Sequence, residues 1–177
     1  MPIDLASFRA QIEKQRLDAL ARISEVPIAA LVWGPNPSGT DPIAQTRLGL
    51  RDALRGRGHY AEFSEDLYDA TSDRSLFAQQ IAQAEAFDVI FSIPGSYGAI
   101  AEIHDFARIP GISHKLIGFV DDAFDDGYST QSLVAAQTNA SCKIQTYNRS
   151  DLPNCIIDYA LDQVARLQEL LYVSGRR

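Results

Sequence analysis

Several features that would assign a function quickly are missing from this sequence. It has only two cysteines, Cys142 and Cys155, too few for a disulfide framework or a cysteine-rich metal site. No apolar run approaches the roughly 20 residues of a membrane-spanning helix, and the first residues are too charged for a signal peptide. Lys and Arg number 16 against 23 Asp and Glu, a formal net charge of -7. We therefore expect a cytoplasmic protein that binds neither membranes nor nucleic acid and uses no metal or redox cofactor.

The chain has the composition and length of one globular domain. Its 177 residues are 46% hydrophobic and 22% charged, enough for a single buried core. Apolar and amphipathic segments alternate along it five times. The predicted strands are residues 27–33, 59–63, 87–93, 115–120 and 143–147. The predicted helices are residues 42–57, a segment capped by Thr71 or Ser72 and running to 86, then 98–108, 129–136 and 152–173.

This alternation predicts the fold class. Strands joined by helical crossovers lie parallel, with helices on both faces of the sheet. We expect one three-layer α/β/α domain over residues 1–177, with a five-stranded parallel sheet of the flavodoxin-like or Rossmann-like type. Ligands of such sheets bind at the carboxyl ends of the strands, near the point where the strand order reverses.

An additional helix is predicted ahead of the first strand, over residues 4–24. Apolar residues recur along it at three- and four-residue spacing, with charged residues between them. We expect the segment 1–25 to pack on the domain, either covering an edge of the sheet or forming a subunit contact. Because the first and last helices both carry long apolar stripes, a homodimer is expected.

The sequence IPGSYGAIAEIHDFA, residues 93–107, has the pattern of a strand end, a glycine-rich turn and a helix. Amides at such a helix start stabilise an anion, so Gly95 and Gly98 are candidates for close approach to a phosphate. Ser96 and Tyr97 are candidate hydrogen-bonding groups in the same turn. Glu102 follows early in the helix, where it either acts on a substrate or complements the helix dipole.

Other strand-end loops are expected to meet this turn. Trp33, Gly34 and Pro35 end the first strand, and the Trp33 ring either stacks on a base or packs in the core. Asp66 follows the second strand and Asp121 ends the fourth. Both are candidates to accept hydrogen bonds from ribose, with solvated turns as the alternative.

Three further residues are expected near the carboxyl ends of the strands. Ser92 ends the strand before the glycine-rich turn and is assigned to the binding site with it. Arg47 and Arg51 lie on the helix after the first loop, where they face either a phosphate or solvent.

The segment 93–107 resembles the turn and helix of the nucleoside 2-deoxyribosyltransferase family, where a small-residue segment leads to a Glu followed by an Ile. It is also similar to the PGGxGTxxE motif of the SLOG superfamily, which includes the cytokinin-activating phosphoribohydrolases. TIR domains share the broader plan, with a catalytic Glu early on a comparable helix. The triplet Trp33-Gly34-Pro35 resembles the strand-end Gly-Pro of the deoxyribosyltransferases.

Enzymes of these families cleave N-glycosidic bonds of nucleosides, nucleotides or NAD. The resemblance therefore implies cleavage or transfer at such a bond, with Glu102 as nucleophile or as stabiliser of an oxocarbenium-like transition state. Two alternatives stay open. One is a non-catalytic module that senses a nucleotide signal, for example in antiviral defence. The other is a structural or oligomerisation domain of the flavodoxin-like type.

Overall fold

The computed structural model describes residues 4–124, 131 and 141–176. Its centre is a parallel five-stranded sheet in the order β2-β1-β3-β4-β5, which is the flavodoxin-like order. The strands are β1 (Ala29–Trp33), β2 (Tyr60–Phe63), β3 (Val89–Ser92), β4 (Leu116–Asp121) and β5 (Lys143–Tyr147). The predicted three-layer α/β/α fold is confirmed, and the strand order selects the flavodoxin-like alternative.

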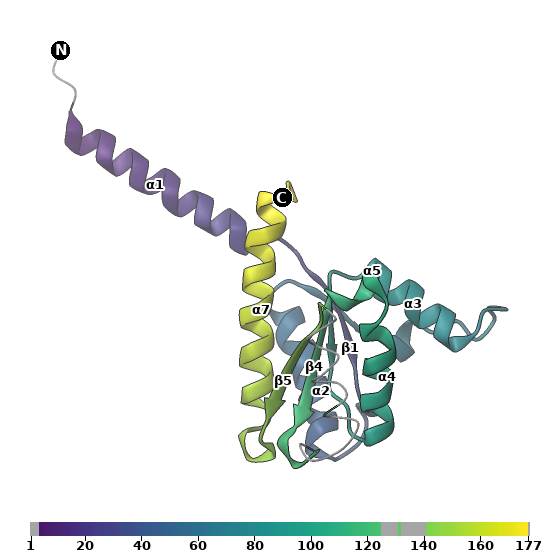
Figure 1. Cartoon of the computed structure of the whole chain (residues 1–177). Helices are drawn as coiled ribbons and strands as arrows, with labels where there is room; N and C mark the ends of the chain where they lie inside the picture. The colour runs from purple at the N-terminus through teal and green to yellow at the C-terminus, as the bar shows by residue number, and fades with distance from the viewer. Residues whose placement is uncertain (1–3, 125–130, 132–140, 177) are drawn as a thin grey trace.

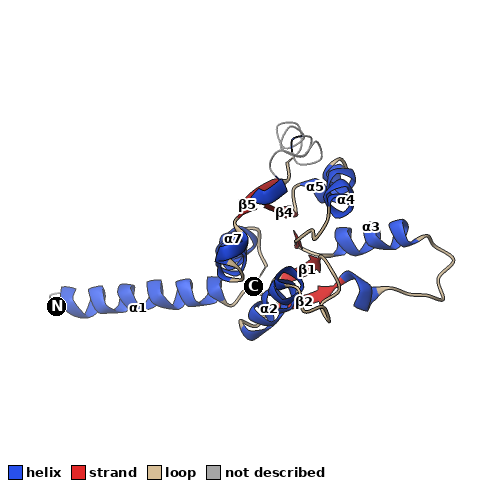
Figure 2. Ribbon diagram, turned by 90° about the horizontal axis from the view of Figure 1, so that it is seen from below, coloured by secondary structure: helices blue, strands red, loops and turns tan. Residues whose placement is uncertain are grey.

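Helices cover both faces of the sheet (Figures 1 and 2). One face carries α2 (Pro42–Gly56) and α7 (Asn154–Val173). The other carries α3 (Leu76–Ala86), α4 (Tyr97–Ala107) and the short α5 (Pro110–Ser113). Three 3-10 turns complete the described elements: η1 (Ser64–Leu67), η2 (Asp122–Phe124) and η3 (Arg149–Asp151). The helix predicted over residues 129–136 lies outside the described residues, apart from position 131.

The strands form because their side chains are apolar on both faces. Every residue of β3 and β4 is buried, as expected of central strands between two helical layers. Two core clusters result, one on each side of the sheet. No helix among the described residues has the length and apolar content to cross a membrane.

Helix starts follow capping chemistry. The carboxylate of Asp41 accepts a hydrogen bond from the Ala44 amide, and Pro42 opens α2 as predicted. The predicted cap of α3 is wrong, because the cap is Ser75. Thr71 instead donates its amide and hydroxyl to Asp69, which holds the preceding residues in a turn and delays the helix.

The N-terminal helix α1 (Leu5–Ser24) projects away from the sheet (Figure 1). It contains no buried residue and contacts α7 near its own C-terminal end. In a single copy of the chain it therefore does not cover an edge of the sheet.

Candidate functional site

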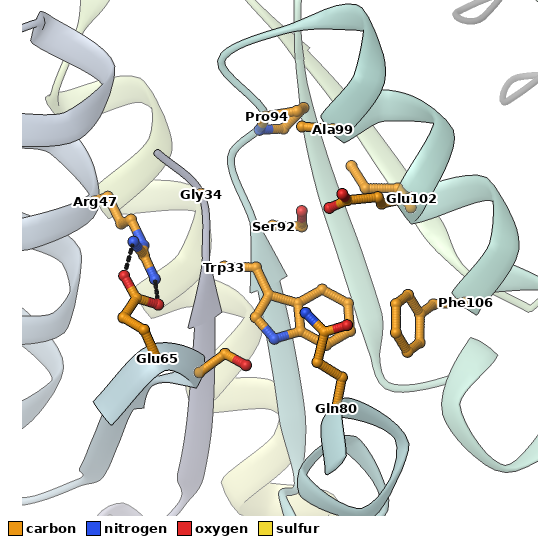
Figure 3. Close-up of a pocket in the computed structure, with 12 residues that line it drawn as sticks. Trp33, Gly34, Arg47, Glu65, Gln80, Ser92, Pro94, Ala99, Glu102 and Phe106 are labelled. Carbon is orange, nitrogen blue, oxygen red and sulfur yellow. Dashed lines mark hydrogen bonds and ion pairs between the residues drawn. The ribbon is translucent and has the colours of Figure 1, made fainter. Parts of the chain in front are cut away.

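A small cavity opens at the carboxyl edge of the sheet, beside the junction of β1 and β3 (Figure 3). This junction is the point where the strand order reverses, so the cavity lies where ligands of this fold class bind. Its volume is about 120 Å³. Twelve residues line it: Trp33, Gly34, Arg47, Ser64, Glu65, Gln80, Ser92, Pro94, Ala99, Glu102, Ile103 and Phe106.

The register of the sheet places two of these residues side by side. Trp33 on β1 pairs with Ser92 on β3, and the amide of Ile93 donates to the Trp33 carbonyl at 3.0 Å. Ser92 is 4% exposed, and its hydroxyl has no hydrogen-bond partner among the described residues. The floor of the cavity therefore holds a free hydroxyl beside an indole ring.

An aromatic cluster forms one side of the cavity. The rings of Trp33 and Phe106 lie 4.6 Å apart between centroids, and Phe77 contacts Phe106 at 5.4 Å. The indole N–H of Trp33 is buried and has no hydrogen-bond partner among the described residues. Gln80 on α3 lies over this ring with its amide directed at the cavity (Figure 3). The predicted Trp33 thus packs on the core while its ring also faces the candidate site.

Gly34 is required by close packing at the end of β1. Its φ of 155° is in the region that favours glycine, and a Cβ atom there would lie 2.8 Å from the Ile93 carbonyl oxygen. The same atom would lie 3.0 Å from Cδ of Arg47. The absence of a side chain at position 34 lets the Arg47 side chain pass beneath the turn.

Arg47 is buried, and the expectation that it faces a phosphate or solvent is wrong. Its side chain is 1% exposed, and all five N–H groups are used. Two bonds go to the Glu65 carboxylate at 2.6 and 2.7 Å, and the others reach the carbonyls of Val32 and Pro35. The guanidinium also lies 4.2 Å above the Phe63 ring. Arg47 therefore neutralises Glu65 and fixes two strand ends.

Glu65 remains ionised because of this pairing. Burial acts to raise the pKa of its carboxyl group, but the hydrogen bonds and charge of Arg47 outweigh burial and lower it overall. The pair contributes no net charge to the cavity wall. Arg51, the other predicted arginine, pairs with its neighbour Asp52 and lies over Phe63.

Glu102 is the free acid of the cavity. It is the sixth residue of α4, exposed, and without a hydrogen bond or ion pair to any described residue. Its carboxylate points toward the Ser92 hydroxyl across the cavity (Figure 3). Because no acid lies in the first turn of α4, stabilising the helix start does not account for this position.

The backbone of the glycine-rich turn is ordinary at Gly95 and Ser96. Ser96 is the N-cap of α4, and its hydroxyl accepts a hydrogen bond from the Ala99 amide at 3.3 Å. Gly95 does not have a positive φ, and a Cβ there would make an ordinary 3.5 Å contact with Pro35. Tyr97 and Gly98 open α4. Neither Gly95 nor Ser96 lines the cavity, and Pro35 contributes only its carbonyl to Arg47.

The two predicted ribose-binding acids lie elsewhere. Asp66 is exposed on η1 and is absent from the cavity lining, where its neighbour Glu65 stands instead. Asp121 is 1% exposed and pairs with Arg149 in a short contact, while also accepting from the Ala123 amide. Burial acts to raise the pKa of Asp121, and the hydrogen bond and charge of Arg149 lower it overall. The structure therefore uses Asp121 to hold η3 against β4.

Five of the predicted residues line the cavity: Trp33, Gly34, Arg47, Ser92 and Glu102. Sequence reasoning missed Phe106, although it lies four residues after Glu102 and so on the same side of α4. It also missed Gln80, which carries no signal in the sequence. Among the described residues no group of three His, Cys, Asp or Glu side chains is placed to hold a metal ion.

Neither a protein family model nor a curated protein sequence matches this chain.

Proposed function

We propose that this protein cleaves or transfers the N-glycosidic bond of a nucleoside or nucleotide-like substrate, with Glu102 as the nucleophile. The observation that carries the proposal is the unpaired carboxylate of Glu102, which faces a cavity at the switch point of the sheet. The cavity also supplies a free hydroxyl from Ser92 and an aromatic wall. A carboxylate and a hydroxyl can hydrogen-bond the hydroxyl groups of a sugar, and an aromatic ring can stack on the base attached to it.

The chemistry follows from the carboxylate. An oxygen of Glu102 attacks C1′ of the sugar, the C1′–N bond breaks, and the electron pair leaves with the base nitrogen, which takes a proton from solvent. Water or a second base then attacks C1′ of the glycosyl ester. This releases the sugar, or a new nucleoside, and restores the carboxylate. In hydrolysis the sum is nucleoside plus water giving sugar plus base.

The size of the cavity fits the sugar better than the whole substrate. Ligand pockets of drug-sized molecules are typically about 300–1,000 Å³, whereas this cavity is about 120 Å³. We place the sugar between Glu102 and Ser92. We place the base beside Trp33 and Phe106, the two aromatic residues of the cavity lining.

The charges of the lining favour an uncharged sugar. Arg47 is the sole cation among the residues that line the cavity, and Glu65 neutralises it. Glu102 leaves the lining with a net negative charge, which disfavours a phosphate inside the cavity. A phosphate on the substrate would have to lie outside it, toward the start of α4.

Release of free base from a panel of nucleosides, nucleoside monophosphates and NAD tests the proposal. Base release by the wild type should fall on the order of 100-fold or more in Glu102→Gln. Asp105→Asn is the matched control, because Asp105 is an exposed acid on the same helix outside the cavity lining. Its activity should equal that of the wild type.

Two experimental outcomes would contradict the proposed enzymatic function. Base release that Glu102→Gln leaves unchanged removes Glu102 from the reaction. A rise in melting temperature with nucleotides but no turnover of any substrate replaces the enzyme with a nucleotide-sensing module of the SLOG or TIR type.

A further inference from the structure

A band of exposed apolar side chains runs along α1, far from the candidate site. Its large members are between 48% and 75% exposed: Leu5, Phe8, Ile12 and Leu20. Helices in proteins are stabilised mostly by packing an apolar face rather than by helix propensity. The exposed band is therefore the feature of α1 that needs a partner.

The base of α1 is fixed to the body of the protein. Gln168 of α7 is buried, and its amide donates to the carbonyls of Ser24 and Val26 at 2.7 and 2.8 Å. Ala19 and Ile23 are half-buried at the end of α1 that contacts α7. The direction in which α1 leaves the domain is set by these contacts.

The side of α1 that meets α7 continues beyond it without cover. At about 100° of rotation per residue, Leu5, Phe8 and Ile12 lie on the same side of the helix as Ala19 and Ile23. In Figure 1 the first turns of α1 extend past the end of α7. At that end of α7, Leu170 and Val173 are 62% and 84% exposed. Two uncovered apolar regions thus flank the junction of α1 and α7.

We propose that α1 pairs in antiparallel orientation with α1 of a second copy of this chain. A two-fold axis near the middle of α1 carries the first turns of each helix to the junction of α1 and α7 in the partner. There Leu5 lies beside the partner subunit's Ile23, near its exposed α7 end. Both apolar regions are covered by one symmetric contact, as a closed dimer requires.

Charge selects the antiparallel orientation. Glu13 and Arg16 lie on one flank of the band, on either side of the midpoint, and pair within the helix at 2.6 Å. Antiparallel pairing places Glu13 beside the partner subunit's Arg16, and the reverse contact forms by symmetry. Parallel pairing would instead place identical charges opposite each other.

The test is the mass of the full chain in solution, measured by light scattering during gel filtration. The wild type should be a dimer, and Phe8→Glu combined with Ile12→Glu should be a monomer. Ser7→Glu combined with Ala10→Glu is the matched control, since both residues are exposed on the side of α1 that faces away from Phe8 and Ile12, and the charge change is the same. That control should remain a dimer with an unchanged melting temperature.

Disulfide trapping tests the orientation. A mixture of Arg9→Cys and Leu20→Cys chains should cross-link to each other, while Arg9→Cys alone should not cross-link to itself. The wild type, with its buried Cys142 and half-buried Cys155, reports on the native thiols. A monomeric wild type, a dimer that survives Phe8→Glu with Ile12→Glu, or self-cross-linking of Arg9→Cys each overturns the proposal.

Discussion

Glu65 binds both terminal nitrogens of Arg47, at 2.6 and 2.7 Å, and so joins the turn after β2 to helix α2 across the end of β1. The remaining N–H groups of Arg47 bind the carbonyls of Val32 and Pro35. This pair determines where the walls of the cavity stand, because η1 and the loop after β1 are both tied to it. It also removes Arg47, the one cation among the described residues of the cavity lining, from contact with a ligand.

Replacing Arg47 with Met should destabilise the fold by about 2–4 kcal/mol, because two strand-end carbonyls and Glu65 lose their donors. Urea denaturation measures the change. Arg51→Met is the control, since Arg51 also lies over Phe63 but, among the residues that the structure describes, pairs only with Asp52 near the surface. Its cost should be about 1 kcal/mol or less. Equal losses in the two variants would contradict a special role for Arg47.

Gly34→Ala should destabilise the fold by about 1–3 kcal/mol, since a Cβ at this φ would press on the Ile93 carbonyl and the Arg47 side chain. Thermal unfolding checks the loss. Gly95→Ala should be nearly neutral, because its Cβ meets only ordinary contact with Pro35. A neutral Gly34→Ala would show that the turn relaxes freely.

Ser92→Ala should weaken the reaction without weakening the fold. Its hydroxyl bonds to no described residue, so stability should change by less than about 1 kcal/mol. If the hydroxyl binds the sugar, KM for the nucleoside should rise about five- to tenfold. Ser113→Ala is the matched control, because Ser113 is a buried serine outside the cavity whose hydroxyl has no hydrogen-bond partner among the described residues. Unchanged kinetics in Ser92→Ala would place the sugar elsewhere.

A nucleoside should be a better substrate than its 5′-monophosphate. The cavity lining carries the unpaired charge of Glu102 and no free cation, so kcat/KM should be about tenfold higher for the nucleoside, or roughly 1.4 kcal/mol. The comparison needs one base and one sugar with and without phosphate. Preference for the monophosphate would show that a phosphate site dominates recognition, while leaving Glu102 as the nucleophile.

Asp121 makes stability depend on pH at the acidic end. Because its pKa is lowered in the folded state, its contribution is fully present above the unfolded carboxyl pKa of about 3.9 and is lost as pH falls through the lower folded value. Asp121→Asn should lose about 1.5–3 kcal/mol at neutral pH and less at acidic pH. Unfolding curves between neutral and acidic pH check this. A constant loss across that range would contradict the linkage.

The sheet was predicted well from the sequence, because central strands that are buried on both faces consist of continuous apolar residues. The apolar runs in residues 27–33 and 115–120 are typical of buried parallel strands. The structure has a strand in each of them, β1 and β4. The start of α3 was less predictable. Thr71, Ser72 and Ser75 are all suitable caps, and only the bond from Thr71 to Asp69 decides among them.

The candidate site was predictable along α4 and at the ends of β1 and β3, where strand, turn and helix follow each other in the sequence. The prediction that Arg47 faces a phosphate or solvent is wrong, although the sequence does carry a signal that Arg47 is buried. Its spacing of four from Ile43 and three from Leu50, both buried, places it on the apolar side of α2. Gln80 could not be found, because only the packing of α3 against the sheet brings it to the cavity.

The walls of the cavity differ in how far they can change. Trp33 and Ser92 sit on neighbouring paired strands, so the spacing of β1 and β3 fixes the distance between their backbones. Gln80, Glu102 and Phe106 come from helices α3 and α4, which are held to the sheet by side-chain packing rather than by a ladder of backbone hydrogen bonds. We therefore expect changes in substrate preference to arise from the residues on the helices, while the positions of Trp33 and Ser92 on the strands stay fixed.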